Sequence, residues 1–166
     1  MQNKLTKTEY YSPAEDTLFF AEYIQNEKGK YALDIGTGSG YQAALLAEIV
    51  HEVYTVERVP HLAELARERL TLLGYRNIEV KVDDGTLGWE EKAPFDAILV
   101  TAGGPHIPKS LLQQLKSGGR LIIPVGDALS QQLILARKTG PDEWVEELLE
   151  HVRFVPLIGQ EGWTGL

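Results

Sequence analysis

The sequence predicts an α/β fold in which a mostly parallel sheet is doubly wound, and two observations carry this prediction. Short apolar runs alternate with segments whose apolar residues recur at helical spacing. Such alternation implies right-handed crossovers, with helices on both faces of one sheet. In addition, the first apolar run leads directly into a glycine-rich turn, and a strand–turn–helix unit of this kind can hold a ligand at the helix N-terminus.

The elements follow in order from local signals. A helix is expected over residues 13–26, because Ser12 can cap it, Pro13 suits its first turn and Glu15 completes a capping box. The helix that opens at Pro60 and closes at Gly74 should turn an apolar face inward, formed by Leu62, Leu65, Ala66, Leu70 and Leu73. The other expected elements are strands at 31–35, 52–57, 78–82, 95–102 and 120–125 and helices at 41–50 and 108–118.

The pattern changes after Gly126. Residues 131–138 alternate as a strand does, and a turn follows. The next segment has some helix propensity, but hairpin-like spacing favours a strand that begins near Trp144 and pairs antiparallel at the sheet edge. We therefore expect seven strands in one domain over residues 1–166, with an amino-terminal helical segment over 1–30.

Composition limits the classes of function. The chain has 166 residues, no cysteine and a formal net charge of -8. An acidic protein is a poor candidate for nucleic-acid binding, and the absence of cysteine fits a reducing cytoplasm. The first residues lack the apolar core of a signal peptide, and no run is long enough to span a bilayer. We expect a soluble, cytoplasmic protein without metal, because the four histidines show no metal-ligand spacing.

The glycine-rich turn is the first candidate site. Gly36, Gly38 and Gly40 alternate with Thr37 and Ser39. Glycine permits positive φ and lets a ligand approach the backbone. The G-x-G-x-G spacing differs from the G-x-G-x-x-G fingerprint of dinucleotide sites. The turn by itself leaves two ligands open, a dinucleotide or another adenosine-bearing cofactor.

Acidic residues at three strand ends favour the second ligand. Glu57 ends a strand where doubly wound folds accept hydrogen bonds from ribose hydroxyls. Asp84 is placed to accept from an adenine amino group, whereas Asp83 is expected to be structural or to face solvent. Asp34 suits the positive charges of a sulfonium amino acid. We therefore predict S-adenosylmethionine (SAM) as the cofactor, while Asp34 as a helix cap and Glu57 as a solvated strand end stay open as alternatives.

Longer motifs resemble a known family. The segments "LDIGTGSGYQAALLAEIV", "VYTVERVPHLAELARERL", "VKVDDGTLGW", "PFDAILVTAGGPHIPKSLLQQLKSGGRLIIPVG" and "VRFVPLIGQEGW" are similar, over residues 32–163, to the protein-L-isoaspartate O-methyltransferases. The resemblance implies a Rossmann-like SAM methyltransferase fold. It also implies an enzyme that methylates the carboxylate of L-isoaspartyl residues in damaged proteins or peptides and releases S-adenosylhomocysteine (SAH).

The matching motifs extend the expected cofactor site. Arg58, Gly85 and Thr101 adjoin the positions above within "VER", "DDG" and "VTA". The resemblance places substrate contacts in the loop 100–105, in the amino-terminal segment and in "VPLIG" at residues 155–159. Ser12 lies close to the position of a Ser-Gln-Pro-type segment in the family, and it is carried over as the expected catalytic residue.

The amino-terminal segment departs from this resemblance. It is expected to be shorter than in the family, and "YYSPAEDTLFFAEYI" is similar to the opening of the release-factor glutamine methyltransferases. A divergent homologue, a truncated form and an engineered recombination of two pieces all stay open. So do a methyltransferase with a different protein or small-molecule substrate, and a SAM-binding scaffold without turnover. The oligomeric state is not predicted.

Overall fold

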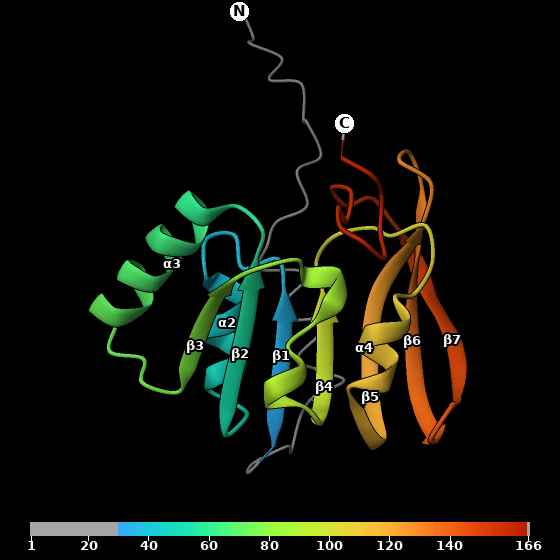
Figure 1. Ribbon diagram of the computed structural model, residues 1–166, viewed down its shortest axis with the longest axis horizontal. Helices are drawn as coiled ribbons and strands as arrows, with labels where there is room; N and C mark the ends of the chain where they lie inside the picture. Colours follow the sequence, from blue (N-terminus) through green and yellow to red (C-terminus); the bar gives the residue numbers. More distant parts are fainter. Residues whose placement is uncertain (1–29, 166) are drawn as a thin grey trace, which may run out of the picture.

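A computed structural model describes residues 30–165, which form a mixed sheet with helices on both faces (Figure 1). Within this range the sheet has seven strands in the order β3-β2-β1-β4-β5-β6-β7. Ser12 and the helix expected at 13–26 lie outside the described residues. The strands are β1 (Tyr31–Ile35), β2 (Glu52–Glu57), β3 (Ile78–Val82), β4 (Phe95–Val100), β5 (Leu115–Gly126), β6 (Gln131–Gly140) and β7 (Glu143–Val152).

The direction of winding reverses between β1 and β4. β1 pairs in parallel with β2 on one side and with β4 on the other, through Asp34↔Thr55 and Asp34↔Leu99. From β1 the chain first builds outward through β2 to β3, and it then returns to build β4 and β5 on the other side. A parallel sheet opens a crevice at such a switch point, beyond the carboxyl ends of its strands.

Two apolar clusters fill the space between the sheet and its helices. Figure 1 shows α2 (Tyr41–Ala47) behind the sheet, α4 (Lys109–Gln113) in front of it and α3 (Pro60–Leu72) beside β3. The cluster behind the sheet includes Ala43 and Leu46 of α2. The cluster in front includes Leu111 and Leu112 of α4. β1 and β4 supply both clusters because their alternate side chains point to opposite faces, and both faces are covered.

The inner face of α3 differs from the prediction. Leu62, Leu65 and Leu73 are exposed, with 39%, 40% and 65% of their surface accessible, whereas Ala66 and Leu70 are buried together with Ala63. Small alanines let the helix approach the glycine turn closely. A methyl group on Gly40 would lie 3.3 Å from Leu70 and 3.5 Å from Ala66. Close backbone packing, rather than the largest apolar side chains, sets the buried face of this helix.

The helix expected at 108–118 is wrong in extent. α4 ends at Gln113, and Leu115 already begins β5 by pairing with Phe95. The Phe95 amide donates to the Gln114 carbonyl at 2.8 Å, so tertiary pairing ends the helix before its sequence pattern does. Two other elements are shorter than expected. The helix expected at 41–50 ends at Ala47, and the strand expected at 95–102 ends at Val100.

The antiparallel carboxyl-terminal edge is confirmed. β6 pairs antiparallel with β5, and β7 pairs antiparallel with β6, in the register Ile134↔Leu148 and Lys138↔Trp144. The strand that was expected to begin near Trp144 begins at Glu143. After β7, residues 153–165 turn back over the carboxyl ends of β4 and β5, which brings the end of the chain to the switch point (Figure 1).

Candidate functional site

A cavity of about 450 Å³ lies at the carboxyl ends of the parallel strands. β1 and β2 contribute their last residues, the loop after β4 contributes Thr101 and Ala102, and the segment after β7 supplies another wall. The lining residues are Ile35, Gly36, Gly38, Val56, Glu57, Arg58, Val59, Leu62, Gly85, Thr101, Ala102, Val155, Pro156, Leu157 and Ile158. The cavity therefore occupies the switch point, where doubly wound folds bind ligands.

The glycine turn presents bare backbone to this cavity. Gly36, Gly38 and Gly40 have φ angles of 96°, 50° and 84°, which residues other than glycine rarely adopt. At Gly36 there is also no room, because a methyl group would lie 2.7 Å from Thr101 Oγ1. Thr101 is fixed there because its hydroxyl donates to the Ile35 carbonyl at 3.0 Å. The sequence therefore allows a ligand to approach closer than side chains would permit.

Glu57 joins the end of β2 to the glycine turn. Its Oε2 accepts a hydrogen bond from the Gly38 amide at 3.0 Å, and its Oε1 accepts from the Val59 amide at 3.0 Å. The side chain lines the cavity although the residue is only 8% exposed. Each carboxylate oxygen can accept a second hydrogen bond. Glu57 is thus held in place by backbone donors and keeps acceptor capacity toward the cavity.

Asp34 lies beneath the turn rather than on the cavity. Its carboxylate is fully buried, and it accepts hydrogen bonds from Gln42 Nε2 and Thr55 Oγ1, both at 2.7 Å. Because Thr55 gives its only hydroxyl hydrogen to Asp34, Thr37 Oγ1 donates to Thr55 across 2.6 Å. Burial raises the pKa of the Asp34 carboxyl from 3.8 to about 6, although the two hydrogen bonds act against the rise. Asp34 supports the turn through Thr37.

The acids after β3 separate as the sequence suggested. Asp83 points to Lys81 at 2.8 Å, and this hydrogen bond lowers the pKa of Asp83. Asp84 Oδ1 accepts from the amide and the hydroxyl of Thr86, and Oδ2 accepts from the Gln160 amide at 2.7 Å. The next residue, Gly85, lines the cavity. Asp84 therefore precedes a lining residue and holds the carboxyl-terminal segment.

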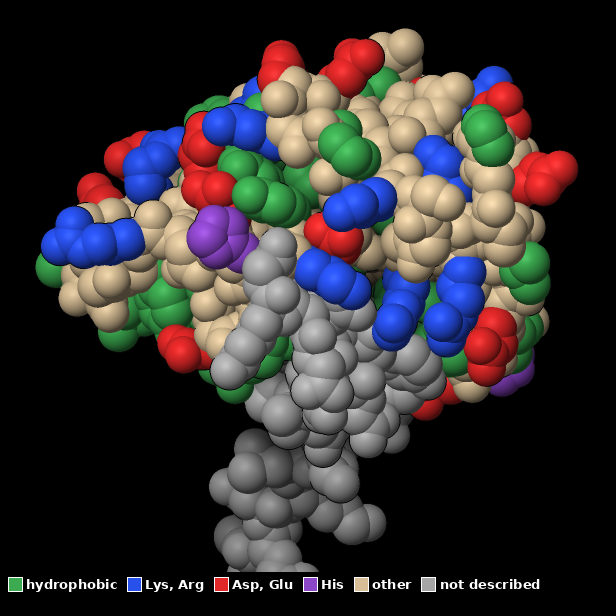
Figure 2. All heavy atoms as spheres, turned by 90° about the horizontal axis from the view of Figure 1, so that it is seen from below, with side chains coloured by type: hydrophobic (Ala, Val, Ile, Leu, Met, Phe, Trp, Pro, Cys, Tyr) green, Lys and Arg blue, Asp and Glu red, His purple; other side chains and the backbone are tan. Residues whose placement is uncertain are grey.

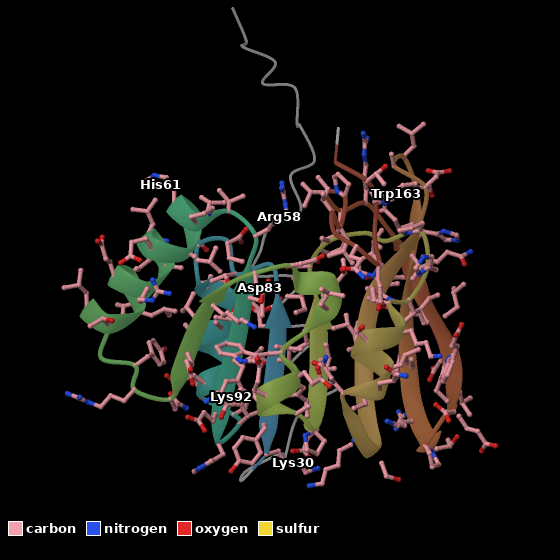
Figure 3. All side chains as sticks on the ribbon, viewed as in Figure 1. Lys30, Arg58, His61, Asp83, Lys92 and Trp163 are labelled. Carbon is pink, nitrogen blue, oxygen red and sulfur yellow. The ribbon has the colours of Figure 1, made fainter. Side chains whose placement is uncertain are left out.

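The cavity brings together only part of the predicted set. The predicted residues on its lining are Gly36, Gly38, Glu57, Arg58, Gly85 and Thr101. Others lie beneath or beside the lining, namely Asp34, Thr37, Ser39, Gly40 and Asp84. Figure 3 shows Arg58 and Trp163 at the carboxyl ends of the strands, with Arg58 on the side of α3 and Trp163 in the segment after β7. A direct contact between a ligand and the residues off the lining stays a prediction.

Apolar walls were the part that sequence reasoning missed. Val59 and Leu62 line the cavity from the start of α3, although Leu62 was expected on the face of that helix that packs inward. Residues 155–158 line it from the other side, and they were expected only as substrate contacts. A signal for Leu62 was present in the sequence. It lies in the first turn of the helix that follows Glu57, so it is at the same end of the sheet as the site.

The opposite end of the sheet has a different surface. Seen from there, Lys and Arg side chains gather around the centre of the described surface, with acidic groups among them (Figure 2). Lys116 pairs with Asp96 at 3.5 Å, and Lys138 donates to the Leu115 carbonyl at 2.9 Å. Asp96 and Lys116 lie near the amino ends of β4 and β5, and Lys138 lies near the carboxyl end of β6, away from the cavity. Within residues 30–165, no helix is long and apolar enough to cross a membrane.

The fold is that of the Rossmann-like SAM methyltransferases. Among solved structures, the chain is similar to a SAM-dependent O-methyltransferase from Thermotoga maritima, with a TM-score of 0.60 at 22% identity, over 89% of this chain and 65% of that one. That likeness supports the fold. The family follows from a more specific match: the model described as "Protein-L-isoaspartate(D-aspartate) O-methyltransferase (PCMT)" covers residues 3–162. The chain belongs to this family.

Relatives and structures agree with the family. The chain is 57% identical to the protein-L-isoaspartate O-methyltransferase of Magnetococcus marinus, over 81% of this chain and 59% of that protein. It is 56% identical to protein-L-isoaspartate O-methyltransferase 2 of Pelobacter propionicus, over 87% of this chain and 65% of that protein. A solved protein-L-isoaspartate O-methyltransferase superposes with a TM-score of 0.83 at 31% identity, over 91% of this chain and 49% of that one.

These shares of length set the scope of the comparison. The chain spans less than two thirds of the curated relatives named above. A Plasmodium falciparum protein assigned to the same enzyme type, solved in complex with SAH, has a TM-score of 0.69 at 27% identity, over 86% of this chain and 71% of that one. The family match begins at residue 3, so it includes the segment that resembles release-factor methyltransferases. That second resemblance stays a prediction.

Proposed function

We propose that the cavity binds SAM. The acid that ends β2, Glu57, is held by two backbone amides and keeps acceptor capacity for ribose hydroxyls. The glycine turn leaves the backbone open where the methionine part would lie. Arg58 and Gly85 line the cavity beside Glu57, where the adenine would lie. SAH bound to the Plasmodium falciparum relative supports the same ligand class for this chain.

We further propose that the acceptor is the carboxylate of an L-isoaspartyl residue in a protein or peptide. Family membership supports this acceptor, because the named relatives at 56% and 57% identity carry that activity in their names. SAM supplies a methyl group on a positively charged sulfur, which is already a good leaving group. A carboxylate is already ionised at neutral pH and attacks without a general base. The protein is then required chiefly to place the two reactants in line.

The residues fit this demand for positioning. Among residues 30–165, the lining of the cavity holds one carboxylate, Glu57, and one guanidinium, Arg58, among mostly apolar and backbone groups. Both charged residues lie on the β2 side, next to the proposed adenosine position. The opposite side, formed by Ala102 and residues 155–158, is apolar. An apolar wall excludes water from the methyl group and strengthens electrostatic contacts nearby. Ser12 as a catalytic residue stays part of the proposal, outside the described residues.

The combination of Glu57 with the glycine turn at the switch point is the observation that carries the cofactor proposal. Its test uses two peptides that differ only in isoaspartate against aspartate, with labelled methyl from SAM and calorimetry of SAM binding on the same sample. We expect binding, and transfer to the isoaspartyl peptide alone. Binding without transfer to either peptide would contradict the acceptor and leave a SAM-binding scaffold or another substrate. Absence of SAM binding would contradict the site itself.

A further inference from the structure

The segment after β7 closes the cavity. Residues 155–163, here named the closing segment, contribute Val155, Pro156, Leu157 and Ile158 to the lining. Gly103 tethers the segment through its backbone, because its amide donates to the Val155 carbonyl at 2.7 Å and its carbonyl accepts from the Leu157 amide at 2.9 Å. Trp163 Nε1 donates to the same Gly103 carbonyl at 3.0 Å. The cavity wall is therefore bound to the loop that follows β4.

Asp84 holds the same segment from the β3 side. Its Oδ2 accepts from the Gln160 amide at 2.7 Å, across 76 residues of sequence. Its Oδ1 is fixed by Thr86, whose amide and hydroxyl donate at 2.9 and 2.7 Å. Thr86 is fully buried, and its hydroxyl oxygen in turn accepts from the Glu161 amide at 3.0 Å. Two successive amides of the closing segment are thus satisfied by one Asp–Thr pair.

Glu161 forms a second anchor on the opposite side. Its Oε1 accepts from the Ser110 hydroxyl at 2.6 Å, and its Oε2 accepts from the Ser110 amide at 3.0 Å. Ser110 lies in the first turn of α4, where backbone amides lack partners within the helix. Hydrogen bonds to an ionised carboxylate are shorter and stronger than neutral ones. The closing segment is therefore attached to α4 by two charge-assisted bonds from a single side chain.

The glycines of the closing segment allow this close packing. A methyl group on Gly159 would lie 2.1 Å from Asp84 Oδ1, and one on Gly162 would lie 2.3 Å from the Leu157 carbonyl oxygen. Neither distance is possible for a real carbon atom. The backbone of the segment lies directly on Asp84, so the position of the wall and that of the carboxylate are linked.

We infer that Glu161 and Asp84 are positioning residues that hold the closing segment as a wall of the cofactor cavity. The inference rests on the proposed function, since it assigns their effect to SAM and SAH binding. Loss of either carboxylate removes hydrogen bonds that hold the segment.

The test combines one readout that needs no ligand with one that does. Hydrogen exchange over residues 155–165 reports whether the wall is held, and calorimetry with SAH reports whether this matters for binding. The variants are Glu161→Ala, Glu161→Gln, Ser110→Ala and the double variant Glu161→Ala with Ser110→Ala. Glu147→Gln serves as the control, because it removes an exposed charge from β7, away from the cavity. Ser110→Ala is also the mild variant, since it leaves the amide bond to Glu161 in place.

We expect Glu161→Ala to speed exchange in the closing segment and to weaken SAH binding about tenfold, the effect of losing a hydrogen bond to a charged group. Glu161→Gln keeps one acceptor oxygen, so its exchange rate and SAH affinity should lie between those of Glu161→Ala and the wild type. Ser110→Ala should add little to Glu161→Ala, because Glu161→Ala already removes the hydrogen bond that the Ser110 hydroxyl makes. In turnover, the KM for SAM should rise more than kcat falls, since saturating SAM restores the wall.

Two outcomes would overturn the inference. One is wild-type SAH affinity in Glu161→Ala, whether or not exchange is faster, since the wall would then not matter for binding. The other is full additivity of the Glu161 and Ser110 changes, which would mean that they act separately. If the wild-type protein binds neither SAM nor SAH, the proposed function fails first and the inference with it, so the two failures are told apart by the wild-type measurement.

Discussion

The amide of Gly38 and the carboxylate of Glu57 are joined by a 3.0 Å hydrogen bond. One residue belongs to the turn after β1, and the other ends β2. Neighbouring parallel strands bring their carboxyl ends to the same edge, so two motifs 19 residues apart in sequence form one surface. The bond fixes the carboxylate before any ligand arrives, which lowers the entropy lost on binding.

Glu57 is therefore expected to dominate cofactor affinity. In Glu57→Gln the new amide group faces a backbone N–H, so one of the two fixing bonds is lost together with the charge. We expect SAM affinity to fall at least about tenfold, measured by calorimetry. Glu68→Gln, which changes an exposed residue of α3, should leave the affinity unchanged. Equal affinities in both variants would place the cofactor elsewhere.

Gly36 is expected to be intolerant of a side chain for two separate reasons. Its φ is 96°, and an added methyl group would lie 2.7 Å from Thr101 Oγ1. Gly74 has a similar φ of 84° but nothing within 4 Å of its added methyl group, so Gly74→Ala isolates the backbone cost. We expect Gly74→Ala to lower the free energy of unfolding by about 1 kcal/mol and Gly36→Ala by about 2–4 kcal/mol.

Urea unfolding measures both glycine variants. Gly36→Ala should also weaken SAM binding, whereas Gly74→Ala should not, because Gly74 follows α3 and is not on the cavity lining. A Gly36→Ala protein as stable as Gly74→Ala would show that Thr101 moves aside at no cost.

The raised pKa of the buried Asp34 carboxyl should make the stability of the protein depend on pH. Its pKa rises from 3.8 to about 6 because burial disfavours the charged form. Between these values the folded state binds more protons than the unfolded state, so the free energy of unfolding falls as pH rises through this window, by about 3 kcal/mol in all. The stabilisation is complete below the unfolded pKa and is lost above the folded pKa.

The measurement is urea unfolding at several pH values from 4 to about 7, where Asp34→Asn removes this component. Asp142→Asn, a change at an exposed aspartate in the turn before β7, should keep the wild-type slope. If Asp34→Asn also kept that slope, another group would be the source.

Gln114 is expected to be a structural centre between the chain after β3 and the start of β5. Its Oε1 accepts from the Trp89 amide and its Nε2 donates to the Leu87 carbonyl, both at 2.8 Å. The side chain is buried, so replacement by alanine leaves one buried and one partly buried backbone group without that partner. We expect Gln114→Ala to lower the free energy of unfolding by about 2–4 kcal/mol.

The neighbouring residue provides the control for Gln114. Gln113→Ala changes the same residue type at an exposed position and should alter stability by less than about 0.5 kcal/mol in the same denaturation experiment. A similar loss in both variants would mean that the end of α4, rather than the Gln114 hydrogen bonds, is responsible.

Local sequence patterns were sufficient to predict the strands that pair regularly with their neighbours. The five parallel strands were found from short apolar runs, and the antiparallel edge from hairpin spacing near Trp144. Glu57 could be assigned to the site because the end of a strand fixes its position in a parallel sheet. The same patterns failed for α4, which gives way to β5 when Leu115 pairs with Phe95. Strand pairing is non-local, so no window of sequence contains it.

The sequence alone determined the alternation of strands and helices, the glycine turn and the acids at the strand ends, because each depends on local periodicity or on a residue's intrinsic freedom. Only the tertiary structure decided that Asp34 lies beneath the turn with Thr55 and Gln42, that Ala63, Ala66 and Leu70 form the buried face of α3 while Leu62 and Leu65 are exposed, and that Asp84 and Glu161 anchor the closing segment. These arrangements depend on contacts between residues distant in sequence, whose distances and burial are set when the sheet assembles.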